Sequence, residues 1–579
     1  MYWNRWIVFV ACALLQTSAG LNYSFSVFAP TLKTLFHLDE VQLGTLATLG
    51  FNLGGYFALA CGAVYDLLGN RNHVGPRAVI LIGASLMFTG YFGIYCMAQG
   101  VFPYSYELLL IFALIAGNSG CWYDTAALAT CIKNYPEDRG TVVGILKSFL
   151  GLSATIYTAA YVVAFQPDTV MFLLFLSLCP TAIAVIMALF ICRVPNEYIE
   201  QEPAVSQTEQ GGENSALEHT PVDLNRKPRS GLSKHTRFAI VYLIVTVLAL
   251  VSMVSAVWSA EHHVVGPGRR VAILVLMALL AAMLLVPISS GPCMYPRRRW
   301  KLSLAAASIR RQSQRAGAAA SAPGNKRSIT DDEEENTEEP LLNASNEDEE
   351  PDTEGDGRET APVREMSTSD ALRTSHFWII MFQALMGIGS GLGFVNNLSG
   401  QVIAMGGAPG GQLVFVSLFS VANASGRMAL GYMSETYLHN HGTPRTLFLV
   451  IVSLLTTVCT ACLSFAKLPD LYAMALLSGF AFGGNWAVIP AILSDLFGLK
   501  HYASTYAFFQ LAPAGGGYIL GTLLIGEMYQ AAMRAHGDDT FCVGTDCYGY
   551  TWRVMTCLNI VALIGTRVLM QRTRSAYGL

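Results

Sequence analysis

The chain has 579 residues, of which 53% are hydrophobic and only 13% are charged, with a formal net charge of −4. Soluble proteins carry about twice that share of charged residues, so the composition excludes a string of soluble domains. It also excludes a disordered chain, because disordered segments are poor in the apolar residues that abound here. The composition therefore predicts an all-α membrane protein.

Apolar stretches long enough to cross a bilayer recur along the chain. A spanning helix needs about 20 mostly apolar residues. Two groups of six such stretches and a central pair lie at about 6–29, 41–65, 77–98, 107–131, 141–165, 169–192, 237–260, 270–290, 376–398, 412–433, 446–466, 470–494, 503–528 and 551–570. We therefore expect about fourteen transmembrane helices, with six-helix bundles at 1–192 and 376–579 and an inserted helix pair at 237–290.

Basic residues gather on one side of this arrangement. Lysines and arginines next to spanning helices mark the cytoplasmic side of a membrane. Most of them fall in the loops that share a side with both termini, and Arg269 and Arg270 are local exceptions beside the central pair. The sequence therefore predicts that both termini are cytoplasmic.

Two long loops differ from the rest of the chain. Residues 193–236 are rich in Glu, Gln, Ser, Gly and Pro, and the loop 291–375 contains an acidic stretch. That stretch, 331–360, holds 15 of the 40 acidic residues and one of the 36 basic ones, which leaves 35 basic and 25 acidic residues elsewhere. Such segments bury too little apolar surface to fold, so we predict two disordered cytoplasmic loops attached to a basic body.

The second helix of each six-helix group ends in a similar pattern. Gly62 precedes Asp66 by four residues, and Gly431 precedes Glu435 by four. A glycine lets two helices approach closely, and a carboxylate at a helix end can bind a helix N-terminus and a guanidinium. Such contacts can form in one conformation and break in another. We predict a gate at each position, with a static helix connection as the alternative.

These patterns carry a family resemblance. Gly62-x3-Asp66-x2-Gly69-x-Arg71 resembles the signature loop of the major facilitator superfamily, which adds Gly69 and Arg71 to the predicted gate. Other segments resemble plant nodulin-like transporters, a group similar to monocarboxylate and oxalate/formate-type porters. They are Arg5 to Pro30, Tyr123 to Leu128 together with Arg139 to Lys147, Thr374-x-x-Phe377-Trp378, Gly483-x-x-Trp486 and Ser494 to His501. The resemblance implies the major facilitator fold and secondary transport of a small solute by alternating access.

Two ionisable residues lie inside consecutive spans of the first bundle. Asp124 is near the end of the fourth span and Lys147 near the start of the fifth, so the two lie at a similar depth. A charge inside the bilayer costs at least about 2.5–3.5 kcal/mol, so we expect an ion pair. The pair is either structural or part of the substrate site, where Lys147 would attract an anion and Asp124 could hold a proton.

Arg427 lies inside the second bundle, four residues before Gly431. This spacing resembles that of monocarboxylate-type porters, whose arginine binds the substrate carboxylate, and a planar guanidinium matches a carboxylate well. Asn423 stands where those porters often carry an aspartate, and Val27 where they carry a lysine, so their scheme of proton coupling is not implied. The resemblance still implies Arg427 and Asn423 as substrate-binding residues. The alternative is that Arg427 extends to the cytoplasmic surface or pairs with Glu435.

Uncharged polar residues are further candidates. The first, fourth, seventh and tenth helices of the twelve-helix core line the cavity in this superfamily. Most buried polar residues are ordinary hydrogen-bond partners between helices, worth about 0.6 kcal/mol each. The resemblance favours Tyr23, Tyr123, Asn396 and Asn485 for substrate binding, among polar residues that also include Gln16, Asn22, Asn52, Gln383, Trp486 and Gln510.

Cys542 and Cys547 lie in a loop that we place on the side opposite the termini. An oxidising compartment would permit a local disulfide there. A zinc ion needs four ligands, and only His536 lies nearby, so a disulfide is the preferred interpretation and no metal site is predicted.

Together, these features predict a secondary active transporter or facilitator of a small organic anion such as a monocarboxylate, with a proton or another ion as the coupling ion. The alternatives are a membrane solute sensor that does not transport, or a porter of a metal ion, an amino acid or a sugar. No P-loop or catalytic constellation indicates an enzyme, and no cofactor is implied. The basic residues at 297–315 flank a span, where anionic lipid explains them better than nucleic acid does.

The sequence also bears on location. We expect a multi-pass protein of the plasma membrane or of a vacuolar or endosomal membrane. Residues 338–342, Glu-Glu-Pro-Leu-Leu, resemble an acidic dileucine sorting signal, although a charged linker is the simpler interpretation.

Overall fold

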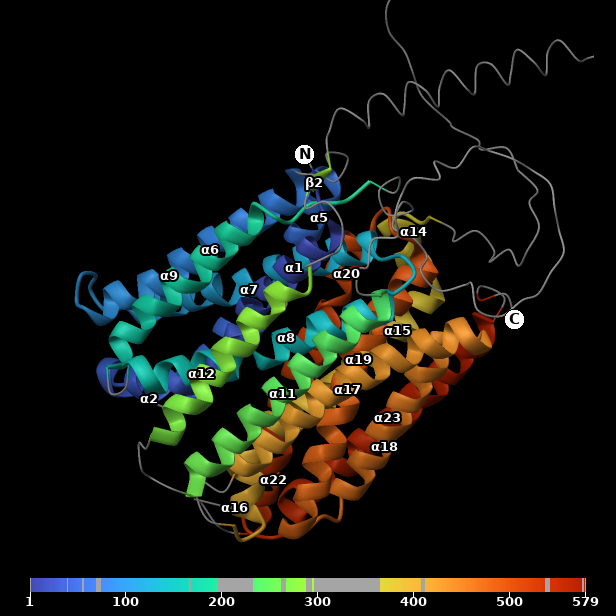
Figure 1. The fold of residues 1–579 in the computed structure, drawn as a ribbon. Helices are drawn as coiled ribbons and strands as arrows, with labels where there is room; N and C mark the ends of the chain where they lie inside the picture. The colour runs from blue at the N-terminus through green and yellow to red at the C-terminus, as the bar shows by residue number, and fades with distance from the viewer. Residues whose placement is uncertain are drawn as a thin grey trace, which may run out of the picture. The chain divides into compact units, whose positions relative to one another are not determined.

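The computed structural model describes residues 2–38, 40–54, 57–68, 74–165, 168–195, 233–261, 267–287, 294–295, 365–407, 412–536, 542–574 and 577. These residues are almost entirely helical (Figure 1). The strands among them are β1 (Tyr2–Trp3) and β2 (Met294–Tyr295), each two residues long. Most of the two predicted disordered loops, together with Gly69 and Arg71 of the predicted gate, lies outside the described residues.

The first six predicted spans are present as helices, and the first two of them are interrupted. The first span is α1 (Arg5–Ala19), a 3-10 turn (Leu21–Ser24) and α2 (Phe25–Phe36), and the second is α3 (Glu40–Thr45), a π-helical stretch (Leu46–Leu53) and α5 (Leu59–Leu68). The others are α6 (Val74–Ala98), α7 (Tyr106–Asn134), α8 (Arg139–Ala160) with a π-helical turn (Tyr161–Phe165), and α9 (Thr169–Ala188).

The second group of six has the same plan. A short helix, α14 (Thr368–Arg373), precedes it, and its fifth span, predicted at 503–528, is broken into several pieces. The helices are α15 (Ser375–Asn396), α16 (Leu398–Ala404), α17 (Gln412–His441), α18 (Arg445–Leu463), a 3-10 turn (Leu468–Asp470), α19 (Leu471–Phe497), α20 (Tyr502–Phe509), α21 (Leu511–Tyr518), a π-helical stretch (Ile519–Leu524), α22 (Ile525–His536) and α23 (Asp546–Arg572).

The inserted pair consists of α11 (Lys234–Glu261) and α12 (Pro267–Ala282), followed by a 3-10 turn (Met283–Leu285). Within the described residues, 11 helices are long and apolar enough to cross a membrane, so the expected number of fourteen is not confirmed. The reason is geometric. The first two spans are broken, and α12, at 16 residues and about 1.5 Å per residue, falls short of a bilayer core about 30 Å thick.

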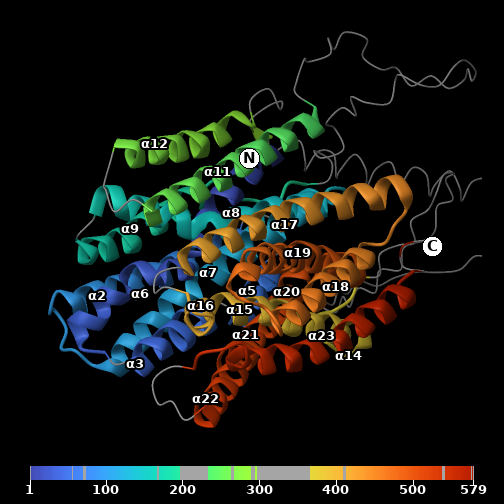
Figure 2. The ribbon, with the colours of Figure 1, turned by 90° about the horizontal axis from the view of Figure 1, so that it is seen from below.

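The two six-helix groups meet along helices that are far apart in the sequence. The helix α5 of the first group packs against α20 of the second, and α8 packs against α17. Figures 1 and 2 both place α11 alongside α8 and α17, so the inserted helix lies on this second seam.

Both ends of the chain lie at the same end of these helices. The Arg5 guanidinium lies 5.1 Å from the ring centre of Tyr135, just before α8 begins. The Tyr577 hydroxyl donates to Asp495 over 3.1 Å, and Arg139, the first residue of α8, lies 3.3 Å from the same carboxylate. We call this end of the helices the terminal face. It is the end that the basic residues predict to be cytoplasmic.

Candidate functional site

Lys147 and Asp124 form the predicted ion pair. The lysine extends from α8 and the aspartate from α7, and their side chains are buried, with relative exposures of 2% and 4% for the two residues. The lysine Nζ lies 2.7 Å from one carboxylate oxygen and 2.8 Å from the other. Burial of either charge alone would be costly, and the pair in this geometry offsets that cost.

A tyrosine from the second bundle completes the pair. Lys147 Nζ donates to the Tyr506 hydroxyl over 2.5 Å, and that hydroxyl donates to Asp124 over 2.7 Å. The ammonium also lies 4.8 Å from the ring centre of Trp486, which suits a cation–π contact. Tyr506 was not among the sequence candidates, because only the packing of α20 against the first bundle brings it to the pair.

Each bundle carries a glutamine bonded to its fourth helix. Gln16 of α1 donates to Asp124 over 2.9 Å, and Gln383 of α15 donates to Asn485 of α19 over 3.2 Å. The two pairs occupy equivalent helices of the two groups. The C-terminal pair is extended by Ser453, which donates to Gln383 over 2.9 Å.

Arg427 is buried on α17, with 1% of its surface exposed. Its Nε donates to Asn423 over 2.9 Å, and its Nη1 donates to the backbone carbonyl of Lys147 in the first bundle. The carboxylate of Glu435 instead binds Arg445 at 2.6 Å. Neither alternative, extension to the surface or pairing with Glu435, describes the contacts seen here.

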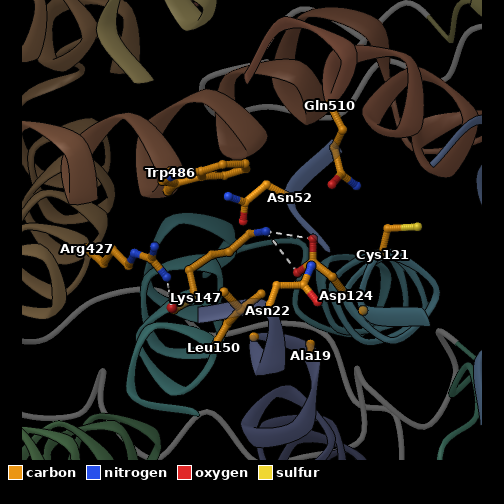
Figure 3. Close-up of a pocket in the computed structure, with 12 residues that line it drawn as sticks. Ala19, Asn22, Asn52, Cys121, Asp124, Lys147, Leu150, Arg427, Trp486 and Gln510 are labelled. Atoms are coloured by element: carbon orange, nitrogen blue, oxygen red, sulfur yellow. Dashed lines mark hydrogen bonds and ion pairs between the residues drawn. The ribbon is translucent and has the colours of Figure 1, made fainter. Parts of the chain in front are cut away.

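A small cavity of about 40 Å³ lies among these residues. In Figure 3, Arg427 and Asp124 lie on opposite sides of Lys147. About 10–15 Å³ on this measure accommodates one water, so the cavity has room for only a few heavy atoms. Its lining comprises Ala19, Gly20, Asn22, Asn52, Gly120, Cys121, Asp124, Lys147, Leu150, Arg427, Trp486 and Gln510.

Three of the predicted substrate-binding residues do not line this cavity, and the side chain of a fourth is not described. The side chain of Tyr23 is not among those described. Tyr123 is buried with its ring against Gly83 of α6, and Asn396 is exposed at the end of α15. Asn485 is buried in the second bundle and does not line the cavity. Helix number alone could not place these side chains, because the face that each presents depends on the rotation of its helix.

At the first predicted gate, α5 and α20 are in close contact. A Cβ added at Gly62 would lie 2.5 Å from the carbonyl oxygen of Ala503, so only glycine permits this approach of α5 to α20. One turn on, the Asp66 carboxylate accepts from the backbone N–H of Ser504, the third residue of α20, over 2.8 Å. Lys133 lies 3.8 Å from the same carboxylate. The contact joins the two bundles at a helix N-terminus, where a negative charge is favoured.

The second predicted gate has the same construction with the bundles exchanged. Gly431 of α17 packs on α8, where an added Cβ would lie 2.7 Å from the Gly140 carbonyl oxygen. Glu435 accepts from the backbone N–H of Gly140, the second residue of α8. Arg445 holds the other carboxylate oxygen at 2.6 Å.

A further connection at the terminal face was not predicted. Arg139 of the first bundle lies 3.3 Å from Asp495 of the second, and it also donates to the Ser494 carbonyl over 3.2 Å. Arg445 binds the same aspartate, so Glu435, Arg445, Asp495 and Arg139 form a continuous chain of charges.

Cys542 and Cys547 are joined by a disulfide in the loop before α23. Within the described parts of the chain, no group of three or more His, Cys, Asp or Glu side chains is placed to hold a metal ion.

Comparisons with known proteins bear on the whole chain. Residues 5–214 match the family described as Nodulin-like. Protein NUCLEAR FUSION DEFECTIVE 4 of Arabidopsis thaliana is 24% identical over 583 residues, a match that covers 99% of this chain and 90% of that protein. The oxalate:formate antiporter of Oxalobacter formigenes is 28% identical over 164 residues, which are 27% of this chain and 37% of the antiporter.

Solved structures are similar to this chain in fold. The proton:xylose symporter XylE bound to 6-bromo-6-deoxy-D-glucose is similar with a TM-score of 0.50, and the match covers 96% of this chain and 94% of that chain. A mutant of the same symporter gives a TM-score of 0.52 over the same shares of the two chains. At 12% identity, this likeness concerns the fold alone.

Proposed function

We propose that this chain, a transporter of the major facilitator superfamily and of its nodulin-like group, carries a small organic anion in the cavity between Lys147 and Arg427. We also propose that the residues lining this cavity bind the cargo and that the contacts of Asp66 and Glu435 gate access to it.

One observation carries the choice of an anion. The cavity lining holds two cationic side chains, Lys147 and Arg427, and a single carboxylate, Asp124. The lining therefore presents more positive than negative charge, which favours an anionic solute over a cationic or neutral one. The planar guanidinium suits a carboxylate in particular.

The cavity size favours a carboxylate of few heavy atoms. At about 40 Å³ it has room for about three waters, which is too little for a hexose in this conformation. The similarity to the oxalate:formate antiporter points to the same class of cargo. The likeness to the xylose symporter, which is limited to the fold, does not oppose it.

The gates support transport by alternating access. Asp66 and Glu435 each cap a helix N-terminus of the opposite bundle, and both contacts lie between the cavity and the terminal face. A solute could leave on that side only if α5 separates from α20 and α8 from α17. The structure then represents the state that is closed at the terminal face, which the basic residues predict to be cytoplasmic.

Asp124 is the proposed coupling site. It is the one carboxylate that lines the cavity within the described part of the chain, and it holds Lys147 at 2.7 Å. A proton on Asp124 would remove the lysine's counterion and leave the ammonium to a substrate anion. Proton and anion would then bind together, which is the requirement for symport. Asn423 cannot take this role, because an amide does not titrate.

Uptake into proteoliposomes tests the proposal. We expect the purified chain to take up labelled formate, acetate or oxalate and not xylose or glucose. Arg427→Gln, which keeps polarity and loses the charge, is expected to raise the KM for the anion about tenfold or more, since hydrogen bonds to charged groups contribute about 1.5–3 kcal/mol. Uptake of sugars in place of the carboxylates would refute the cargo. Binding of an anion without net flux would indicate a sensor.

A further inference from the structure

Tyr506 connects the cavity to the gate at the terminal face. It lies on α20 two residues after Ser504, which binds Asp66 of the gate, and four residues before Gln510, which lines the cavity. Its hydroxyl bonds to Lys147 and Asp124, both on the other bundle. One short helix of the second bundle thus carries a contact with the first bundle at the gate and another at the substrate site.

The donors of Lys147 show why a substrate would disturb Tyr506. An ammonium has three N–H donors. Two of them are used by the oxygens of Asp124 and the third by the Tyr506 hydroxyl. An anion can bind Lys147 only in place of one of these partners.

An anion that binds Lys147 would displace the Tyr506 hydroxyl rather than Asp124. Asp124 binds Lys147 through both carboxyl oxygens and is also held by Gln16 at 2.9 Å, whereas Tyr506 binds Lys147 through one neutral oxygen. A carboxylate oxygen that takes the third donor of Lys147 must occupy the place of the phenol oxygen. Two oxygens cannot share that position, so the phenol has to move, and it loses its bond to Asp124 as well.

We propose that the Tyr506 hydroxyl is a latch, which holds α20 against the first bundle while the cavity is empty and which a bound anion releases. This inference rests on the proposed function for the identity of the anion, but the latch itself does not depend on it. Release loosens α20 at the position where Ser504 meets Asp66. Anion binding therefore favours opening at the terminal face, and the empty protein stays closed there.

The structure offers a matched control on the same helix. Tyr502 lies one turn before Tyr506, is equally buried and stacks on it with ring centres 5.8 Å apart. Its hydroxyl has no hydrogen-bond partner among the described residues. Tyr502→Phe and Tyr506→Phe each remove one buried hydroxyl from α20 and keep the ring, but only the second removes the latch.

Labelling of Cys121 is the readout, because this thiol lines the cavity. The full chain is reconstituted in one orientation, a membrane-impermeant maleimide is added on the terminal face, and the Cys121 peptide is quantified by mass spectrometry. Without any anion, we expect Tyr506→Phe to be labelled about tenfold faster than the native chain, since it lacks hydrogen bonds to charged groups, and Tyr502→Phe at the native rate. Formate is expected to accelerate labelling of the native chain and to have little effect on Tyr506→Phe.

The outcomes separate the latch from the cargo. Native-rate labelling of a folded Tyr506→Phe protein overturns the latch, even if the native chain transports formate. Equal acceleration in Tyr502→Phe also overturns it, because the effect would then be one of packing. Fast labelling of Tyr506→Phe with no effect of formate on the native chain supports the latch and counts against formate as cargo. A second readout is the KM for formate uptake, which we expect to fall about tenfold in Tyr506→Phe as the competing hydroxyl is lost.

Discussion

The two bundles carry equivalent polar pairs that differ in charge. In the first bundle, Gln16 bonds to a carboxylate, Asp124, whose charge is matched by Lys147. In the second, Gln383 bonds to an amide, Asn485, and Ser453 completes a neutral network. Asp124 and Lys147 line the cavity, whereas Gln383 and Asn485 do not. The same helix arrangement thus holds a neutral network in one bundle and, in the other, the ion pair that we propose as part of the anion site.

The largest effect is expected from Lys147→Ala. It leaves the Asp124 carboxylate buried without its cation, a change that typically costs about 3–5 kcal/mol. We expect a lower melting temperature in detergent and loss of uptake per molecule at the membrane. The double variant Lys147→Ala/Asp124→Ala should recover much of the stability but none of the uptake. Unchanged uptake per molecule in Lys147→Ala would remove the lysine from the site.

Exchanging the carboxylate of Asp124 and the amide of Asn485 between the two bundles tests whether the difference in charge matters. Asn485→Asp buries a carboxyl beside the neutral side chain of Gln383, and we expect a stability loss below that of Lys147→Ala, because the carboxyl can take up a proton. Asp124→Asn gives the first bundle the chemistry of the second. It should retain anion binding but lose the dependence of uptake on a proton gradient. Gradient-driven uptake by Asp124→Asn would exclude Asp124 as the coupling site.

The two glycine contacts at the terminal face should respond alike to an added methyl group. A Cβ at Gly62 or Gly431 would lie 2.5–2.7 Å from a carbonyl oxygen of the opposite bundle, and backbone cannot give way cheaply. We expect Gly62→Ala and Gly431→Ala to favour opening, seen as faster labelling of Cys121 from that face. Gly526→Ala is the control, because an added Cβ there has no atom within 4 Å. Equal labelling in all three variants would mean that these contacts are not gates.

The smallest effect should come from neutralising the capping carboxylates. A carboxylate at a helix N-terminus contributes about 0.3–1 kcal/mol when exposed and up to about 2 kcal/mol when partly buried. We expect Glu435→Gln to accelerate labelling more than Asp66→Asn, since Glu435 binds Arg445 at 2.6 Å whereas Lys133 lies 3.8 Å from Asp66. The reverse order would show that the salt bridge adds little to the cap.

Local patterns predicted the helical membrane fold and the Lys147–Asp124 ion pair. Apolar length located the bundles, and equal depth in antiparallel spans identified Lys147 and Asp124 as partners. Helix interruptions were harder to foresee. The break after α1, for example, falls at Gly20, where an added Cβ would lie 2.3 Å from the carbonyl oxygen of Leu150 on α8. That constraint comes from a neighbouring helix and has no local signature.

Contacts between the two bundles also could not be predicted from the sequence. Tyr506 meets the ion pair, and Arg139 meets Asp495, across separations of more than 350 residues. Tyr123 lies on α7, which lines the cavity through Asp124, but its own ring faces Gly83 of α6. Asn396 lies on α15, none of whose described residues lines the cavity. The type of a residue and its depth in the membrane follow from the local sequence, whereas the direction in which its side chain points depends on how the helices pack.

Binding of acetate, compared with binding of acetamide, tests the central claim most directly. The two molecules are close in size and shape and differ in charge. Isothermal titration of the purified chain should detect saturable binding of acetate that weakens at least tenfold in Arg427→Gln, and no binding of acetamide at the same concentrations. Equal binding of the two molecules, or acetate binding that Arg427→Gln leaves unchanged, would contradict an anion site between Lys147 and Arg427.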